Sequence, residues 1–227
     1  MFSQRSQEKE ILDMGSEYYS QEEYEECMKK LFSVNRLFGF FYSTRTLLRK
    51  YAKNSAVVDV GCGSGLFLLN LSRYFPQMKM SGIDISEQAI QLANTLQKKT
   101  PSKNVTFKRQ ELASLQSEHG NIDIVLATLV CHHLDHDDLA KFLSDAQSIA
   151  AKAVIINDLH RHPLAYYFYK IISPIFKNKL ITNDGLISIC RGFTRKELQN
   201  ILKHASITHY QIKWCFPFRW RIIIWKP

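Results

Sequence analysis

The sequence predicts an α/β fold built on a doubly wound, mostly parallel sheet, and three observations predict it. The chain of 227 residues is 45% hydrophobic and 22% charged, which is a globular composition long enough to bury a full core. Between residues 56 and 158, short apolar strands alternate with helical patterns, as is typical of a parallel sheet covered on both faces. The stretch VVDVGCGSG, residues 57–65, runs from a buried strand straight into a glycine-rich turn.

The predicted elements divide the chain into two parts. Residues 1–53 read as an N-terminal helical cap or lid, because apolar residues recur at helical spacing from Leu31 to Leu48. Residues 54–227 form the main domain. Its strands are expected at 56–60, 79–84, 105–110, 122–128 and 153–158, and its first helices at 64–74, 86–99 and 135–150.

The last third begins with an insertion at about residues 161–192, which we expect to be helical and to cover a substrate. Its aromatic segment, residues 163–177, suits a lid, ordinary packing, or a surface that rests on anionic lipid. A helix then begins after Thr194, with Glu197 at the spacing of a capping box. Strands at 207–214 and 219–225 predict an antiparallel hairpin at the sheet edge.

Composition also limits the expected cellular location and the use of the cysteines. The first ten residues lack the apolar core of a secretory signal, and no apolar run approaches a membrane span, so we expect a cytoplasmic protein. Five cysteines stand without a C-x-x-C pair, which favours free thiols over a disulfide framework or a zinc site. The sequence therefore predicts no metal site.

Charge is distributed unevenly along the chain. Eight acidic residues lie between Glu8 and Glu26, whereas twelve Lys and Arg residues follow from Arg161 onward against only two acids. A basic surface of this kind suits nucleic acid, an anionic membrane or an acidic substrate. On composition alone, the favoured interpretation is the solvated face of a protein with a high isoelectric point.

The glycine-rich turn and a second acid indicate a ligand site. Glycines 61, 63 and 65 favour conformations that other residues resist and expose backbone N–H groups. Asp84 ends the second strand nineteen residues after Gly65, where a doubly wound fold brings a carboxylate beside a bound ribose. Ser86 is the better N-cap for the next helix, which leaves Asp84 for the ribose.

These stretches, VVDVGCGSG, GIDIS and IDIVLATLVCHHL, resemble the Rossmann-like class I S-adenosylmethionine-dependent methyltransferases over about residues 55–215. The resemblance implies S-adenosyl-L-methionine as cofactor and S-adenosyl-L-homocysteine as product. It places Asp59 and the glycines at the methionine end, Asp84 at the ribose and Glu111 at the adenine, although Gln110-Glu111 replaces the commoner Gly-Asp. The full implied cofactor set is Asp59, Gly61, Cys62, Gly63, Gly65, Asp84, Ile85, Glu111, Leu112, Thr128 and Leu129.

Within that resemblance, the chain is similar to bacterial methyltransferases of small molecules, including those of secondary-metabolite and quinone chemistry. We expect a small, aromatic or lipophilic acceptor, with methylation of oxygen favoured over ring carbon. A hydroxyl acceptor must lose a proton, and histidine can take it near neutral pH. The candidates follow the fourth and fifth strands and are His132, His133, Asp158 and His160.

Each candidate also has a purely structural explanation. The pair His132-His133 also suits packing at the start of a helix, and Asp158 also suits a turn cap before solvated histidines. Farther along, Asp184 and Arg191 are expected to pair with each other across a loop.

Other classes of function remain open at this level. The basic last third admits an RNA or protein methyltransferase, but TLVCHHL lacks the Asn/Asp-Pro-Pro-aromatic element of the exocyclic-amine methyltransferases of nucleic acids. A cofactor-binding protein without turnover is a further alternative. A nicotinamide-dependent oxidoreductase would have a glycine at position 66, where this chain has Leu66.

Overall fold

The computed structural model describes residues 2–15, 17–100, 102–118 and 122–226. They form a seven-stranded sheet in the order β3-β2-β1-β4-β5-β7-β6. The strands are β1 (Ala56–Val60), β2 (Lys79–Asp84), β3 (Val105–Arg109), β4 (Ile124–Thr128), β5 (Ala153–Leu159), β6 (Tyr210–Cys215) and β7 (Arg219–Trp225). The first five pair in parallel, and β7 runs antiparallel to both β5 and β6. The predicted doubly wound sheet with an antiparallel C-terminal hairpin is confirmed.

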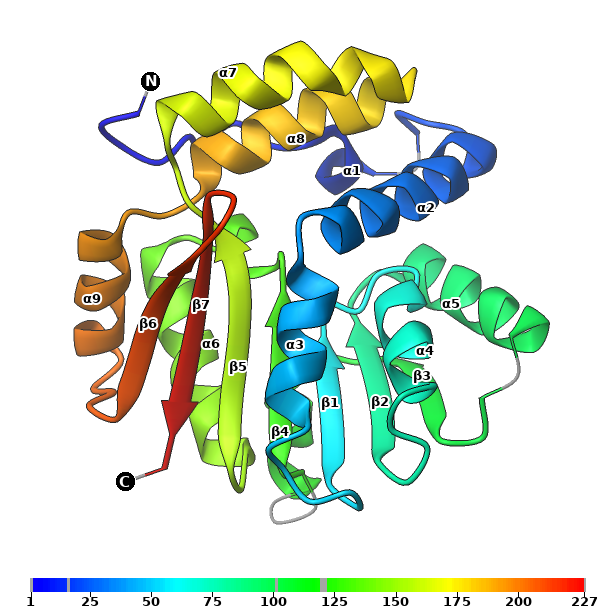
Figure 1. The fold of residues 1–227 in the computed structure, drawn as a ribbon, viewed down its shortest axis with the longest axis vertical. Coiled ribbons are helices and arrows are strands. Elements are labelled where there is room, and N and C mark those ends of the chain that lie inside the picture. The colour runs from blue at the N-terminus through cyan, green and yellow to red at the C-terminus, as the bar shows by residue number, and fades with distance from the viewer. Residues whose placement is uncertain (1, 16, 101, 119–121, 227) are drawn as a thin grey trace.

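The helices connect and cover these strands (Figure 1). They are α1 (Ile11–Met14), α2 (Gln21–Leu37), α3 (Phe40–Leu48), α4 (Leu66–Ser72), α5 (Glu87–Lys99), α6 (His136–Ile149), α7 (Pro163–Ile172), α8 (Lys179–Arg191) and α9 (Arg195–His204), with the 3₁₀ turns η1 (Leu112–Glu118), η2 (Cys131–His133) and η3 (Ser173–Phe176). The predicted capping box of Thr194 and Glu197 is present. Ser86 and Asp135 are N-caps rather than first helical residues, which explains the small shifts from the predicted bounds.

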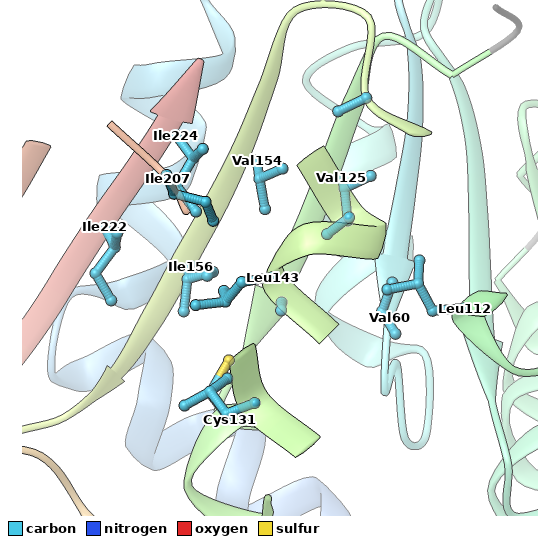
Figure 2. Close-up of a cluster of buried hydrophobic side chains, with 14 of the residues drawn as sticks. Val60, Leu112, Val125, Cys131, Leu143, Val154, Ile156, Ile207, Ile222 and Ile224 are labelled. Atoms are coloured by element: carbon cyan, nitrogen blue, oxygen red, sulfur yellow. The ribbon is translucent and has the colours of Figure 1, made fainter. Parts of the chain in front are cut away.

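Alternation along the strands divides the core between the two faces of the sheet. Val58 and Val60 of β1 pack with α6 and α9, whereas Val57 packs with α3 and α4 on the opposite face. Figure 2 shows the first of these clusters, in which Val154 and Ile156 of β5 lie beside Ile222 and Ile224 of β7. Covering both faces is what the near-continuous apolar strands require.

A third layer lies over the carboxyl ends of the parallel strands. Figure 1 shows α2, α7 and α8 across this edge of the sheet. The predicted insertion at about 161–192 is helical, and its role in covering a substrate stays a prediction. Tyr169 of α7 packs inward and donates a hydrogen bond to the backbone oxygen of Ile181. Tyr167 and Ile171, on the outer face of α7, are exposed. The aromatic segment therefore contributes both to packing and to an exposed surface.

The N-terminal helices do not all belong to this cover. Phe41, Leu47 and Leu48 of α3 pack against the sheet within the main core, whereas α2 packs with α8. The division at residues 53 and 54 stays a prediction. No described helix is long and apolar enough to cross a membrane. The five cysteines are free, as expected.

Candidate active site

A cavity of about 340 Å³ opens where the parallel strands end, beneath α2 and α8. The glycine turn, the ends of the strands and the helices of the cover meet at this cavity. Open α/β sheets bind their ligands at this position, beyond the carboxyl ends of their strands. Of the residues predicted from the sequence, those that line it are Asp59, Gly61, Cys62, Gly63, Asp84, Thr128, Leu129, His132 and His133. One concave site therefore collects residues that are up to 74 positions apart in the chain.

The glycine turn presents bare backbone to this cavity. Gly61, Gly63 and Gly65 have φ angles of 67°, 52° and 70°, in the left-handed region that glycine tolerates best. A side chain at Gly63 would project into open space, with Met28 Sδ at 3.9 Å as its nearest neighbour. Glycine here leaves room for a ligand to approach the chain closely.

Asp84 is held against this turn. Its Oδ2 accepts a hydrogen bond of 2.9 Å from the N–H of Gly63, and its Oδ1 accepts one of 2.9 Å from the N–H of Ser86. Ser86 in turn caps α5, as expected. Each carboxylate oxygen retains a further lone pair, so the group can still accept hydroxyl protons from a ligand.

Asp59 lies deeper in the same wall and is 3% exposed. Burial disfavours its charged form, and the nearby Asp84 adds repulsion, so the pKa of Asp59 rises to about 7. A cationic group bound beside it would relieve both effects.

The end of β4 supplies two further signs of a ligand site. Leu129 has a φ of 59°, which is strained for a non-glycine residue, and its N–H donates to the backbone oxygen of Asn157. The buried Oγ1 of Thr128 has no hydrogen-bond partner within the described residues. Both residues line the cavity, so an incoming polar group would satisfy that hydroxyl.

Four of the predicted cofactor residues do not line the cavity. Gly65 packs against Phe107, Leu112 belongs to the core, and Ile85 and Glu111 are exposed. Their assignment came from the resemblance alone and stays a prediction.

The histidine pair after β4 is bound to carboxylates from distant parts of the chain. His132 Nδ1 lies 2.7 Å from Asp158 Oδ1, and its Nε2 lies 3.5 Å from Glu10 Oε1. Burial alone would lower the pKa of His132, but Asp158 and Glu10 outweigh it and raise the pKa to about 9. His133 Nδ1 lies 2.9 Å from Asp13 Oδ2. Asp158 therefore orients His132, across neighbouring strands.

His160 lies outside this cavity. Its Nδ1 accepts a hydrogen bond from Trp214 Nε1, and burial beside His162 lowers the pKa of His160 to about 4. The adjacent Arg161 is buried and pairs with Glu197 at 2.6 Å. The predicted residues around the end of β5 thus separate into Asp158, which is buried behind His132 and does not line the cavity, and His160, which packs elsewhere.

The N-terminal segment is fastened over the cavity by α8. Asp184 accepts hydrogen bonds from the N–H groups of Ile11 and Leu12, at 2.9 and 3.1 Å. Arg191 donates to the backbone oxygens of His132 and His133. The expected pairing of Asp184 with Arg191 is wrong: both lie on α8, where Asp184 binds Ile11 and Leu12, whereas Arg191 binds the backbone oxygens of Glu8, His132 and His133.

Two cavity residues had no signal in the sequence. Glu10, in the acidic N-terminal stretch, reaches the histidine pair, and its Oε1 accepts a hydrogen bond of 2.6 Å from Ser188 Oγ. Arg219 begins β7 in the basic last third, and its guanidinium lies 4.6 Å from the ring centre of Phe40. Its buried Nε has no hydrogen-bond partner among the described residues. Only the tertiary fold brings either group to the cavity.

The sheet order, the glycine turn and the acid that ends β2 define a class I methyltransferase fold. Residues 57–152 match the sequence model of a family described as a methyltransferase domain. The resemblance seen in the sequence is thereby confirmed over these residues.

Individual relatives agree on the class and differ in what they act on. A malonyl-[acyl-carrier protein] O-methyltransferase of Bacillus cereus is 27% identical over 72% of this chain and 62% of its own. The protein-lysine N-methyltransferase EFM4 of Saccharomyces cerevisiae is 35% identical over 78 residues, which are 34% of this chain and 34% of its own. The chain spans less than two thirds of the length of these curated relatives. A SAM-dependent methyltransferase structure from Aquifex aeolicus superposes with a TM-score of 0.64 at 18% identity, covering 91% of this chain and 98% of that one.

Proposed function

We propose that this chain is an enzyme that binds S-adenosyl-L-methionine and transfers its methyl group to a hydroxyl of a small aromatic or lipophilic acceptor. The observation that carries the proposal is the single cavity in which Asp84, bonded to the glycine turn, faces the same space as His132 and His133. The residues proposed to bind the cofactor thus face the histidines proposed to act on the acceptor.

The residues present fit the cofactor. The open space at Gly63 admits a ligand against the backbone, Asp84 offers lone pairs to ribose hydroxyls, and the unpaired Thr128 hydroxyl offers a donor. Asp59 suits a cationic amino group. When bound, the cofactor supplies a methyl group already activated by the positive charge of its sulfonium. The chain then has to align the acceptor and exclude water, and such positioning is worth up to roughly 7 to 11 kcal/mol of barrier.

The cavity also has apolar walls and a buried guanidinium, that of Arg219, which would suit an acceptor. Its walls include Leu31, Phe32, Leu180 and Ile181, which suit an aromatic or lipophilic body. Arg219 suits an oxygen-bearing or anionic substituent on that body, because its Nε would otherwise remain buried without a partner. The cover of α2 and α8 favours a small acceptor over a folded macromolecule.

The histidine pair supports methylation of oxygen. His133 lines the cavity at the end of β4, held by Asp13, and would take the proton that the acceptor hydroxyl gives up. His132, held by Asp158 and protonated near neutral pH by its pKa of about 9, would instead donate a hydrogen bond to the acceptor oxygen. The proposal includes the cytoplasmic location expected from the sequence, which fractionation of the source cells would test.

A transfer assay tests this function. Purified protein is incubated with methyl-labelled S-adenosyl-L-methionine and a host-cell extract, which is then separated into organic-soluble, protein and nucleic-acid fractions. We expect label in the organic-soluble fraction, lost in the Asp84→Ala variant. Label in protein or RNA would instead favour the alternative of a macromolecular acceptor, and binding of S-adenosyl-L-homocysteine without transfer to any fraction would favour a non-catalytic protein.

A further inference from the structure

We propose that Glu10, His132 and His133 form a binding site for a divalent transition-metal ion, with zinc the best match. One ligand atom from each residue lies within 4.8 Å of the other two. The cysteine pattern of the sequence predicts no metal, but these ligands come from two segments that are more than 120 positions apart, so no local motif could reveal them.

The distances suit an ion after a small contraction. Glu10 Oε1 lies 3.5 Å from His132 Nε2, and Glu10 Oε2 lies 4.0 Å from His133 Nε2. Zinc binds imidazole nitrogen and carboxylate oxygen at about 2.0 to 2.2 Å, which separates neighbouring ligand atoms by roughly 3 to 3.5 Å. Side-chain shifts on the order of 1 Å would therefore close the site.

The groups behind the ligands are those that metal sites use. His132 Nδ1 lies 2.7 Å from Asp158 Oδ1 and His133 Nδ1 lies 2.9 Å from Asp13 Oδ2, so each ring can direct Nε2 toward Glu10. Metal-bound histidines commonly donate their other N–H to a carboxylate in this way. The Glu10 carboxylate is itself held by Ser188 Oγ. Both imidazoles and the carboxylate are thus oriented by partners outside the trio.

Charge and burial favour a cation at this point. Three carboxylates, Glu10, Asp13 and Asp158, meet two imidazoles, and Glu10 and His132 are 5% and 2% exposed. Arg191 approaches Asp13 only at 4.0 Å, and its other nitrogens donate to backbone oxygens. A dication would balance the negative charge of Glu10 and Asp158, which water reaches poorly.

The ligand set selects the kind of metal. Two histidines and one carboxylate are a catalytic zinc set with a position left open, and the same set suits other first-row ions such as iron(II). Magnesium and calcium prefer all-oxygen ligands. The three residues line the cavity, so the open position would face the acceptor.

The role of the ion in the reaction rests on the proposed function, although its binding does not. An acceptor hydroxyl bound to the ion would lose its proton to water more readily. An oxygen lone pair would then form the bond to the methyl carbon as the carbon–sulfur bond breaks, and S-adenosyl-L-homocysteine would leave. The histidine pair would thus act on the acceptor through the ion.

Calorimetric titration of chelator-treated, full-length protein with zinc chloride, without cofactor, tests the binding. We expect one zinc per chain, with affinity reduced at least tenfold by Glu10→Gln and by His133→Asn, and roughly 10- to 100-fold by Asp13→Asn. The matched control is His204→Asn, because His204 is an exposed histidine that pairs with Asp137 at 3.7 Å and is neither one of the three ligands nor one of the groups that hold them. It should bind zinc as the unmodified chain does, and circular dichroism checks that each variant folds.

No stoichiometric binding, or binding left unchanged by Glu10→Gln and His133→Asn, would overturn the site and leave a proton-bridged network of His132 between Glu10 and Asp158. Titration of the same preparations with S-adenosyl-L-homocysteine separates the two proposals. Zinc binding without binding of S-adenosyl-L-homocysteine would reject the proposed function and keep the metal site. Binding of S-adenosyl-L-homocysteine without zinc binding would reject the metal site and keep the proposed function.

Discussion

At the scale of single residues, Asp84 joins the glycine turn to the end of β2. Replacing it with alanine removes a charged acceptor from Gly63 and from a ribose, so we expect Asp84→Ala to weaken binding of S-adenosyl-L-homocysteine by about 1.5 to 3 kcal/mol, roughly ten- to one-hundred-fold. Calorimetry measures this directly. The matched control is Asp135→Ala, which removes the N-cap of α6 outside the cavity and should leave the affinity unchanged. Equal affinities in the two variants would make the ribose assignment wrong.

Asp59 gives the site a pH dependence. Its pKa of about 7 means that the ionised form, which suits the cationic amino group of the cofactor, prevails only above neutral pH. We expect the affinity for S-adenosyl-L-homocysteine to fall as pH decreases from 8 to 6, by calorimetry. The Asp59→Asn variant should bind more weakly and show a flatter profile, and an unmodified protein with no slope over this range would reject the assignment.

The raised pKa of Asp59 affects the stability of the fold in the opposite direction from ligand binding. Because the folded pKa of Asp59 lies above its unfolded value of 3.8, the folded protein holds this proton more tightly than the unfolded chain. The contribution of Asp59 to the free energy of unfolding therefore increases as pH falls from about 7 toward 4 and is lost above the folded pKa. Ligand binding and stability should thus respond to acidification in opposite directions through one carboxyl group.

At the scale of elements, α8 holds the N-terminal segment against the cavity through Asp184. Removing that carboxylate leaves the N–H groups of Ile11 and Leu12 without an acceptor, so Asp184→Ala should lower the free energy of unfolding by about 1 to 3 kcal/mol. It should also accelerate trypsin cleavage after Lys9. Denaturant titration and timed proteolysis measure the two effects.

Asn183→Ala is the control for that variant. Asn183 donates to the same carboxylate but is exposed and does not touch the N-terminal segment, so its loss should leave cleavage near Lys9 unchanged. Cleavage that is equally fast in both variants would mean that Asp184 does not fasten the segment.

The helices and strands also show which features of the fold and of the site could be predicted from the sequence. Strands, crossover helices and the caps at Ser86 and Thr194 depend on local patterns, and they are found within a few residues of their predicted places. The glycine turn and Asp84 are likewise local signals. Glu10 and Arg219 reach the cavity through tertiary packing alone, and the separation of His160 from Asp158 depends on how β5 meets the start of α7. Proximity in the sequence was therefore a poor guide to which residues lie together around the histidine pair.

At the scale of the whole molecule, we expect a bound ligand to stabilise the sheet and the helices that cover it together. Residues of α3 share a core with β1 and β4, whereas α2 and α8 pack over the strand ends, so the N-terminal helices are tied to the sheet and to the cover at once. A ligand in the cavity would contact the strand ends and the cover helices α2 and α8 together. Binding should then stabilise the entire chain rather than one part of it.

We expect S-adenosyl-L-homocysteine at one hundred times its Kd to raise the free energy of unfolding by about 2.7 kcal/mol. For a chain of this size that corresponds to a rise in Tm of roughly 5 to 10 °C in a single transition. NADH should produce no rise, because Leu66 stands where a dinucleotide fingerprint has its third glycine. Differential scanning calorimetry with each ligand distinguishes the outcomes. A rise with NADH alone would favour an oxidoreductase, whereas two transitions, of which only one moves, would show that the cover unfolds independently of the sheet.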